Sequence, residues 1–280
     1  MVRVVVTGGA GQLARAVAQT WTGMELIVPD ESVLDLASAG SIRRVIREAK
    51  PDIVFNAAAF TAVDRCETEP GFAYDINGMA VGRLAGACSE QGALLVHIST
   101  DYVFDGLGTR PYREDDPTGP RSVYGKSKLL GEEQARLAEE HLIVRTAWLY
   151  DIWGKNFYNT MLNAAAQDQP LRVVDDQVGS PTTCRALARQ IKIAVEERWR
   201  GTVHCTCSGA TTWHGFAAAI FQKAGMRADL NPCLTSAYPL PAPRPAYSVL
   251  DGAKRALLGT DVMPPWGEAL DEVIRARNSI

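Results

Sequence analysis

"VVVTGGAGQLA", residues 4–14, is the stretch of this sequence that decides its fold. Its consecutive valines are apolar and β-branched, which predicts a buried strand over residues 2–9. The spacing of the apolar residues that follow predicts a helix over residues 11–21. A buried strand that runs through glycines directly into a helix begins a β–α unit of a parallel sheet.

The turn inside this unit has the composition of a phosphate-binding turn. Gly8, Gly11 and Ala14 fit the pattern G-x-x-G-x-x-G/A. Glycines allow a tight turn and close approach of a pyrophosphate, and the helix N-terminus adds N–H groups and positive dipole character. Purely structural turns also contain glycines, but between a strand and a helix this pattern predicts dinucleotide binding.

The first half of the chain repeats this alternation of strand and helix. Apolar runs predict strands over residues 25–30, 51–59, 93–104 and 141–150, and helical spacing predicts helices over 41–50, 73–92 and 122–140. This order predicts an α/β fold, a Rossmann-type doubly wound parallel sheet. We assign residues 1–150 to a dinucleotide-binding domain.

The second half of the chain has a different pattern. Its predicted helices cover residues 156–167, 184–199 and 212–225, and its short strands lie within 170–182 and 201–209. Five of the 15 prolines lie in residues 231–251, which excludes a central strand or a helix and indicates an ordered wall around a site. We predict a smaller, discontinuous substrate-binding region of residues 151–171 and 208–280, with parts of 172–207 joining the first domain.

Composition excludes several classes of protein. The chain has 280 residues, 46% of them hydrophobic and 22% charged, which is typical of a globular protein. The net charge of −3 provides no basic field for nucleic acid, and we expect neither a nucleic-acid partner nor a membrane span. The N-terminus runs directly into a strand without a signal peptide, so we expect a cytoplasmic protein. The six cysteines form no C-x-x-C pair, and we expect buried reduced thiols and no metal site.

"VYGKSK", residues 123–128, sets a phenol and an amine four positions apart. On a helix these side chains share one face, so the ammonium of Lys128 should lower the pKa of Tyr124 and make it a better proton donor. The alternative is that Tyr124 and Lys128 lie on the protein surface and have no function. Thr100 ends a predicted strand on the same edge of the sheet, and its hydroxyl can hydrogen-bond a substrate carbonyl. We predict that Thr100, Tyr124 and Lys128 catalyse the reduction of a ketone.

Two acids and a run of small residues complete the expected cofactor site. Asp30 closes the second predicted strand, where a carboxylate can accept hydrogen bonds from a ribose diol and would favour NADH. Asp35 could meet the adenine, although both acids could instead cap local turns. Ala57, Ala58 and Ala59 end the next strand and leave room for a flat cofactor, or alternatively for tight helix packing.

These motifs resemble those of extended short-chain dehydrogenases/reductases and, more narrowly, the dTDP-4-dehydrorhamnose reductase family. The resemblance covers almost the whole chain. It is carried by "NAAAFTAVDRCETEP" (56–70), "STDYVFDG" (99–106), "YGKSKLLGE" (124–132), "VRTAWLY" (144–150), "GKNFYNTML" (154–162), "DQVGSPT" (176–182), "TTWHGFA" (211–217) and "RPAYSVLD" (244–251).

The resemblance implies reduction of the C4 ketone of dTDP-4-dehydro-L-rhamnose to dTDP-L-rhamnose, with NADPH or NADH as cofactor. Thr100, Tyr124 and Lys128 match the family's catalytic positions. Residues that match its cofactor positions are Gly11, Gln12, Leu13, Asp30, Asp35, Leu36, Ala57, Ala58 and Ala59. Residues that match its sugar pocket are Val63, Asp101, Tyr102 and Trp148.

Other functions and contacts remain open at this stage. Arg244 in the Pro-rich segment is the candidate ligand of the substrate diphosphate, because guanidinium suits phosphate oxygens, or it is a structural Arg of that loop. The chain could reduce a related dTDP-4-keto-6-deoxy sugar, or act as a non-catalytic regulatory subunit like the β subunit of methionine adenosyltransferase. Some family members pair through a metal bridge on a Glu early in the first helix. Here that region has Arg15 and Ala16, so we expect a monomer or a weak homodimer.

Overall fold

The computed structural model describes residues 1–167 and 169–279, and a six-stranded parallel sheet forms its centre. The strands are β1 (Arg3–Thr7), β2 (Glu25–Ile27), β3 (Ile53–Asn56), β4 (Leu94–Thr100), β5 (His141–Thr146) and β10 (Gly201–His204). Their order across the sheet is β10-β5-β4-β3-β1-β2, and every neighbouring pair is parallel. The predicted doubly wound sheet is confirmed.

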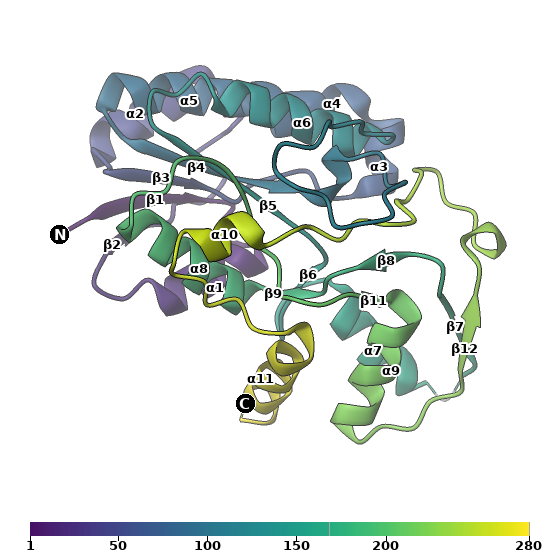
Figure 1. Ribbon diagram of the computed structural model, residues 1–280. Helices are drawn as coiled ribbons and strands as arrows, with labels where there is room; N and C mark the ends of the chain where they lie inside the picture. Colours follow the sequence, from purple (N-terminus) through teal and green to yellow (C-terminus); the bar gives the residue numbers. More distant parts are fainter. Residues whose placement is uncertain (168, 280) are drawn as a thin grey trace.

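Helices cover both faces of this sheet (Figure 1). The helices α2 (Ala39–Ala49), α5 (Ala80–Gln91) and α6 (Val123–Ala135) lie on one face, and α1 (Gln12–Thr20) and α8 (Cys184–Glu196) lie on the other. Alternate residues of β1 enter the two cores: Val4 and Val6 pack beneath α1 and α8, and Val5 packs beneath α2 and α5. Burial on both faces explains why the three central residues of β1, Val4 to Val6, are all apolar.

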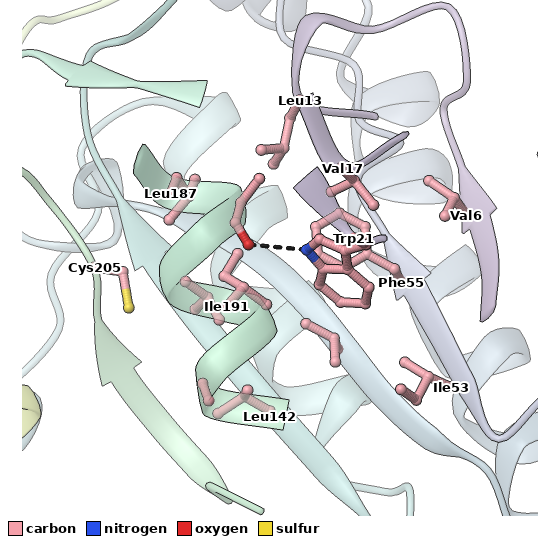
Figure 2. Close-up of a cluster of buried hydrophobic side chains, with 14 of the residues drawn as sticks. Val6, Leu13, Val17, Trp21, Ile53, Phe55, Leu142, Leu187, Ile191 and Cys205 are labelled. Carbon is pink, nitrogen blue, oxygen red and sulfur yellow. Dashed lines mark hydrogen bonds between the residues drawn. The ribbon is translucent and has the colours of Figure 1, made fainter. Parts of the chain in front are cut away.

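The packing of α8 ties the second half of the chain to the first (Figure 2). The indole of Trp21, the C-cap residue of α1, is buried against Phe55 and donates a hydrogen bond from Nε1 to the carbonyl oxygen of Ala188, at 2.9 Å. The strand that follows α8, β10, extends the central sheet beside β5. We therefore propose that α8 and β10 belong to the dinucleotide-binding domain, in keeping with the division predicted for residues 172–207.

The rest of the second half surrounds a smaller core. Its helices are α7 (Phe157–Ala165), α9 (Trp213–Ala224), α10 (Ala253–Leu257) and α11 (Trp266–Asn278). Short strands pair as β6 (Leu149–Tyr150) with β9 (Thr182–Thr183), β8 (Val178–Gly179) with β11 (Thr211–Thr212), and β7 (Leu171–Val174) with β12 (Leu230–Cys233). Side chains from α7, α9, α11 and β7 form this second core below the sheet in Figure 1. No helix of the described residues is long and apolar enough to cross a membrane.

Several segments differ from the sequence prediction. The helix expected over residues 73–92 is three pieces: α4 (Pro70–Tyr74), a π-helical turn η1 (Asp75–Met79) and α5. The helix expected over residues 122–140 ends at Ala135. The strand expected over residues 141–150 is broken after Thr146 into β5 and β6, and α10 and α11 lie where no element was predicted.

Candidate active site

The strand order of the central sheet reverses between β1 and β3. Parallel sheets bind ligands at the carboxyl ends of their strands at such a switch point. The Gly-rich turn after β1 meets the alanines after β3 there, since a Cβ added to Gly8 would lie 2.9 Å from the Ala58 Cα. Gly8 has φ +70°, a conformation that glycine adopts without strain. The structure thus brings the predicted turn and the predicted alanines together.

The N-terminus of α1 is suited to an anion. Gly11 is its N-cap residue and offers no side-chain acceptor to the first N–H groups of the helix. The side chain of Leu13 is buried in the core, so its backbone N–H is the part available to a phosphate. The Gln12 side chain donates to the carbonyl oxygen of Leu149 at 3.2 Å and accepts from Asn156 at 3.0 Å, which joins this turn to the second half of the chain.

Gly8→Ala is expected to weaken NADPH binding at least about tenfold, because the new methyl group would displace the backbone of Ala58 and move the turn. The measurement is the dissociation constant from NADPH fluorescence. Gly92→Ala is the matched control, since Gly92 has the same φ of +70° with nothing within 4 Å of an added Cβ. Equal loss of affinity in both variants would contradict a specific role of the turn.

The acids expected at the adenosine end are exposed and partly engaged. Oδ1 of Asp30 accepts hydrogen bonds from the Ser32 N–H (2.9 Å), the Ser32 hydroxyl (2.6 Å) and the Val33 N–H (3.1 Å). These bonds lower the pKa of Asp30 and hold it as a carboxylate. Asp35 accepts from the Ala37 N–H at 2.9 Å. Both acids therefore shape their own turns, as the alternative interpretation required, and a cofactor role for either remains a proposal.

Leu36 of the same loop is half-buried against the core beneath α2 and α5. Its carbonyl oxygen accepts from Arg83 at 3.1 Å. Arg44 on α2 also reaches this loop, where it donates to the carbonyl oxygen of Val33 at 3.0 Å. Two guanidinium groups thus lie on the loop that follows β2, although no Arg follows Asp30 directly in the sequence.

The predicted catalytic residues come from two neighbouring elements. Thr100 ends β4, and Tyr124 and Lys128 lie on α6, whose N-terminus is capped by Ser122. Helix α6 approaches η2 (Asp101–Val103), the turn that follows β4. A Cβ on Gly125 would lie 2.2 Å from the Tyr102 carbonyl oxygen of that turn. This contact places Tyr124 near the Thr100 hydroxyl.

The predicted effect of Lys128 on the pKa of Tyr124 is wrong. Burial raises the pKa of Tyr124, and the Thr100 hydroxyl lowers it only in part. The Lys128 amine points elsewhere and donates to the Ile98 carbonyl oxygen at 2.6 Å. The residue as a whole is 2% exposed. Burial also lowers the pKa of Lys128 to about 8. The phenol therefore stays protonated at neutral pH, and the amine titrates close to neutral pH.

Two further side chains expected in the sugar pocket adjoin this group. The Tyr102 ring meets the Tyr124 ring edge to face, with centroids 5.4 Å apart. Asp101 is 2% exposed and accepts from the Thr100 hydroxyl at 2.9 Å. Burial raises the pKa of Asp101 to about 6, against the hydrogen bonds from Ser248 and Thr100. A buried carboxyl beside the catalytic hydroxyl is suited to accept a hydrogen bond from a sugar hydroxyl.

Arg244 and Val63 lie together at the edge of the Pro-rich segment. Arg244 forms a bidentate pair with Asp64, at 3.0 and 2.8 Å, and donates to the Ala242 carbonyl oxygen at 2.8 Å. Asp64 follows Val63 in the short helix α3 (Val63–Thr68), so this pair fastens the Pro-rich segment to α3. Three of the five N–H groups of Arg244 are used in this way, which leaves two for a phosphate.

Trp148 lies in a separate aromatic stack. Its backbone has φ +48°, and its indole is parallel to that of Trp213, with ring centroids 3.4 Å apart and an interplanar angle of 5°. A Cβ on Gly179 would lie 2.4 Å from this indole. The positive φ ends β5 and turns the ring onto the second core, which explains why the strand predicted over 141–150 is broken.

The comparison with protein families decides the relationship. The RmlD substrate binding domain family matches residues 2–279. The chain belongs to this family. The spore coat polysaccharide biosynthesis protein SpsK of Bacillus subtilis (strain 168) is 44% identical over 283 residues, which cover 100% of this chain and 99% of that protein.

Two solved structures of dTDP-4-dehydrorhamnose reductases superpose closely on the chain. A dTDP-4-dehydrorhamnose reductase from Clostridium acetobutylicum ATCC 824 has a TM-score of 0.97 and 41% identity, covering 99% of this chain and 100% of that one. The dTDP-4-dehydrorhamnose reductase from Bacillus anthracis str. Ames, solved in complex with NADP, has a TM-score of 0.96 and 35% identity with the same coverage. The resemblance noted in the sequence is confirmed.

Several residues around this RmlD-family site were not singled out in the sequence. Trp213 completes the stack with Trp148, and Asp64 binds Arg244 across 180 residues. Asn77 in the π-helical turn η1 donates to the Ser127 hydroxyl at 3.0 Å, on the helix that carries Tyr124. His97, on β4, lies 3.4 Å from the Lys128 amine. These contacts join segments that are distant in the sequence, and no local spacing of residues predicts them.

Proposed function

We propose that the chain is an NAD(P)H-dependent reductase that converts the C4 ketone of dTDP-4-dehydro-L-rhamnose into the hydroxyl group of dTDP-L-rhamnose. The observation that carries this proposal is the group of Thr100 at the end of β4 with Tyr124 and Lys128 on α6, at the same edge of the sheet as the uncapped N-terminus of α1 and its glycine turn. That turn fits a dinucleotide pyrophosphate. The names of the structurally similar reductases, one of them bound to NADP, support the same substrate and cofactor.

Each residue has one task in this reaction. The bound cofactor supplies a hydride to the ketone carbon. When the substrate binds, the Thr100 hydroxyl turns its single O–H from Asp101 to the ketone oxygen and holds that oxygen near Tyr124. The phenol of Tyr124, kept protonated by burial, gives its proton to the oxygen as negative charge develops there. Lys128, whose pKa lies near 8, returns a proton toward the phenolate after the transfer.

The deciding experiment follows NADPH consumption with dTDP-4-keto-6-deoxyglucose and its 3,5-epimerase, which together supply the substrate. Turnover that needs the epimerase supports the proposal. Turnover without the epimerase would identify a reductase of a related dTDP-4-keto-6-deoxy sugar. NADPH binding without turnover would favour a regulatory subunit on this fold.

NADH is expected to be used at least as well as NADPH, and its advantage in kcat/KM is expected to stay below about tenfold. Asp30 has an oxygen, Oδ2, that can accept from the ribose 2′-OH, and its carboxylate repels a 2′-phosphate. The guanidinium of Arg44, from α2, reaches the same loop and would offset part of that repulsion. The measurement is kcat/KM for each cofactor at a fixed sugar concentration. Asp30→Ala should shift the ratio toward NADPH, and an unchanged ratio would remove Asp30 from the ribose site.

Arg244→Ala is expected to raise the KM of the dTDP-sugar about tenfold or more while leaving the KM of the cofactor nearly constant, because charged hydrogen bonds to the diphosphate would be lost. The matched variant is Asp64→Asn, which frees the guanidinium without removing it. If Arg244 binds phosphate, Asp64→Asn keeps the sugar KM low. If Arg244 only fastens the Pro-rich segment, the two variants raise the sugar KM alike.

A further inference from the structure

A buried polar chain crosses three strands of the central sheet and ends at the Lys128 amine. The Thr7 hydroxyl on β1 lies 2.6 Å from Asn56 Oδ1 on β3, and Asn56 Nδ2 lies 3.0 Å from His97 Nδ1 on β4. His97 Nε2 lies 3.4 Å from the Lys128 amine on α6. Each of these four side chains is at most 2% exposed. The chain therefore connects the strand that carries the Gly-rich turn to a catalytic residue.

The donors and acceptors along this chain fix the tautomer of His97. The Ala58 N–H donates to the Thr7 hydroxyl oxygen at 3.2 Å, so the proton of that hydroxyl is directed to Asn56 Oδ1. The Asn56 amide nitrogen is then the group that donates to His97 Nδ1. His97 is neutral, because burial lowers its pKa well below the usual value. A neutral imidazole with an accepting Nδ1 carries its proton on Nε2.

This tautomer matters to Lys128. An ammonium has three donors and no acceptor, so it gains nothing from an Nε2–H group that points at it. An unprotonated amine has a lone pair that can accept from Nε2–H while it donates to the Ile98 carbonyl oxygen. We propose that His97 is a positioning residue whose Nε2–H holds the unprotonated Lys128 amine in place and thereby favours that form. The inference rests on the proposed function, because Lys128 serves the reductase reaction.

The other groups that surround Lys128 do not outweigh the effect of His97 on the protonation of its amine. From α6, Glu132 favours the ammonium at a distance, but it is itself bound by Arg145 at 2.8 Å. From η1, the Asn77 backbone oxygen packs against Gly131 beside His97 Nε2. From β4, the Ile98 carbonyl oxygen accepts from the amine in either protonation state. Burial lowers the pKa of Lys128 to about 8, and the proposed contact with His97 would act in the same direction.

Such an effect serves the proton transfer. After Tyr124 has given its proton to the substrate, the phenolate must be protonated again, and an acid whose pKa lies near the working pH does this best. An exposed Lys, with its ordinary pKa of about 10.4, holds its proton too tightly. The chain Thr7–Asn56–His97 also anchors the imidazole, so the amine is held against a fixed donor.

His97→Asn and His97→Gln separate positioning from structure. The Asn side chain places a polar group where Nδ1 lies and loses the contact with the Lys128 amine. The longer Gln side chain places a polar group where Nε2 lies and keeps that contact. We expect His97→Asn to lower kcat about tenfold and to move the basic limb of the kcat–pH profile about one unit higher. His97→Gln should recover most of kcat. A basic limb that stays in place in His97→Asn, or moves lower, overturns the proposal.

A second measurement does not depend on turnover. The ¹⁵N spectrum of histidine-labelled enzyme is expected to show His97 with unprotonated Nδ1 and protonated Nε2 from about pH 6 to about 9, and both signals should shift in Lys128→Met. A proton on Nδ1 overturns the proposal even if the enzyme is active. If the His97 variants do not fold, Thr7→Val removes only the hydroxyl that orients Asn56, and it should move the basic limb in the same direction. Wild-type enzyme without turnover on any dTDP-sugar contradicts the proposed function, while the spectrum still decides the role of His97.

Discussion

Tyr124→Phe is expected to lower kcat by roughly 10²–10⁴, which is the usual contribution of general acid catalysis. The variant keeps the ring and its edge-to-face contact with Tyr102, and loses only the hydroxyl that gives a proton to the ketone oxygen. Burial holds the wild-type phenol protonated, so the loss should persist across neutral pH. The measurement is NADPH consumption at saturating sugar, together with the dissociation constant of NADPH, which should change little.

Tyr102→Phe is the matched control for this variant. Tyr102 is the neighbouring phenol, and burial raises its pKa as well. If Tyr102 contacts the sugar but does not donate the proton, its hydroxyl contributes mainly to KM, and kcat should fall by less than about tenfold. A larger loss in Tyr102→Phe than in Tyr124→Phe would show that the wrong phenol was assigned.

The parts of the fold that the sequence predicts are those in which local pattern and tertiary packing agree. β1 was predictable because its valines are buried on both faces, and the Gly-rich turn because its glycine at φ +70° meets another backbone. The π-helical turn η1 was not, since residues 73–92 have the pattern of one continuous helix. Its register is set by α6, where a Cβ on Gly131 would lie 2.2 Å from the Asn77 carbonyl oxygen.

The candidate site likewise has features that local sequence pattern predicts and features that depend on tertiary packing. Thr100, Tyr124 and Lys128 were predictable because strand ends and a spacing of four on a helix bring them to one edge of the sheet. The direction of the Lys128 side chain was not, because it depends on the Ile98 carbonyl oxygen and on His97, both on another element. The pKa argument for Tyr124 failed for this reason: spacing along a helix gives the shared face but not the partner of an amine.

Lys128→Met is expected to reduce kcat by roughly 10²-fold or more and, at the same time, to stabilise the protein. Lys128 is 2% exposed, and burial of its charged amine costs free energy. Met has a similar length and no charge, so it fills the same space. At pH 7 we expect a gain of at least about 1 kcal/mol in the free energy of unfolding, after the loss of the hydrogen bond to the Ile98 carbonyl oxygen.

The pH dependence identifies the cause of that gain. The pKa of Lys128 is about 8 in the folded chain against 10.5 for the free side chain, so between these values the unfolded chain binds a proton that the folded chain does not. The free energy of unfolding of the protein with Lys128 therefore rises with pH across this window. The advantage of Lys128→Met should be largest below pH 8 and should disappear toward pH 10.5. Urea unfolding of both proteins across this range gives the difference, and an advantage that is constant with pH would mean that packing, and not the buried charge, accounts for it.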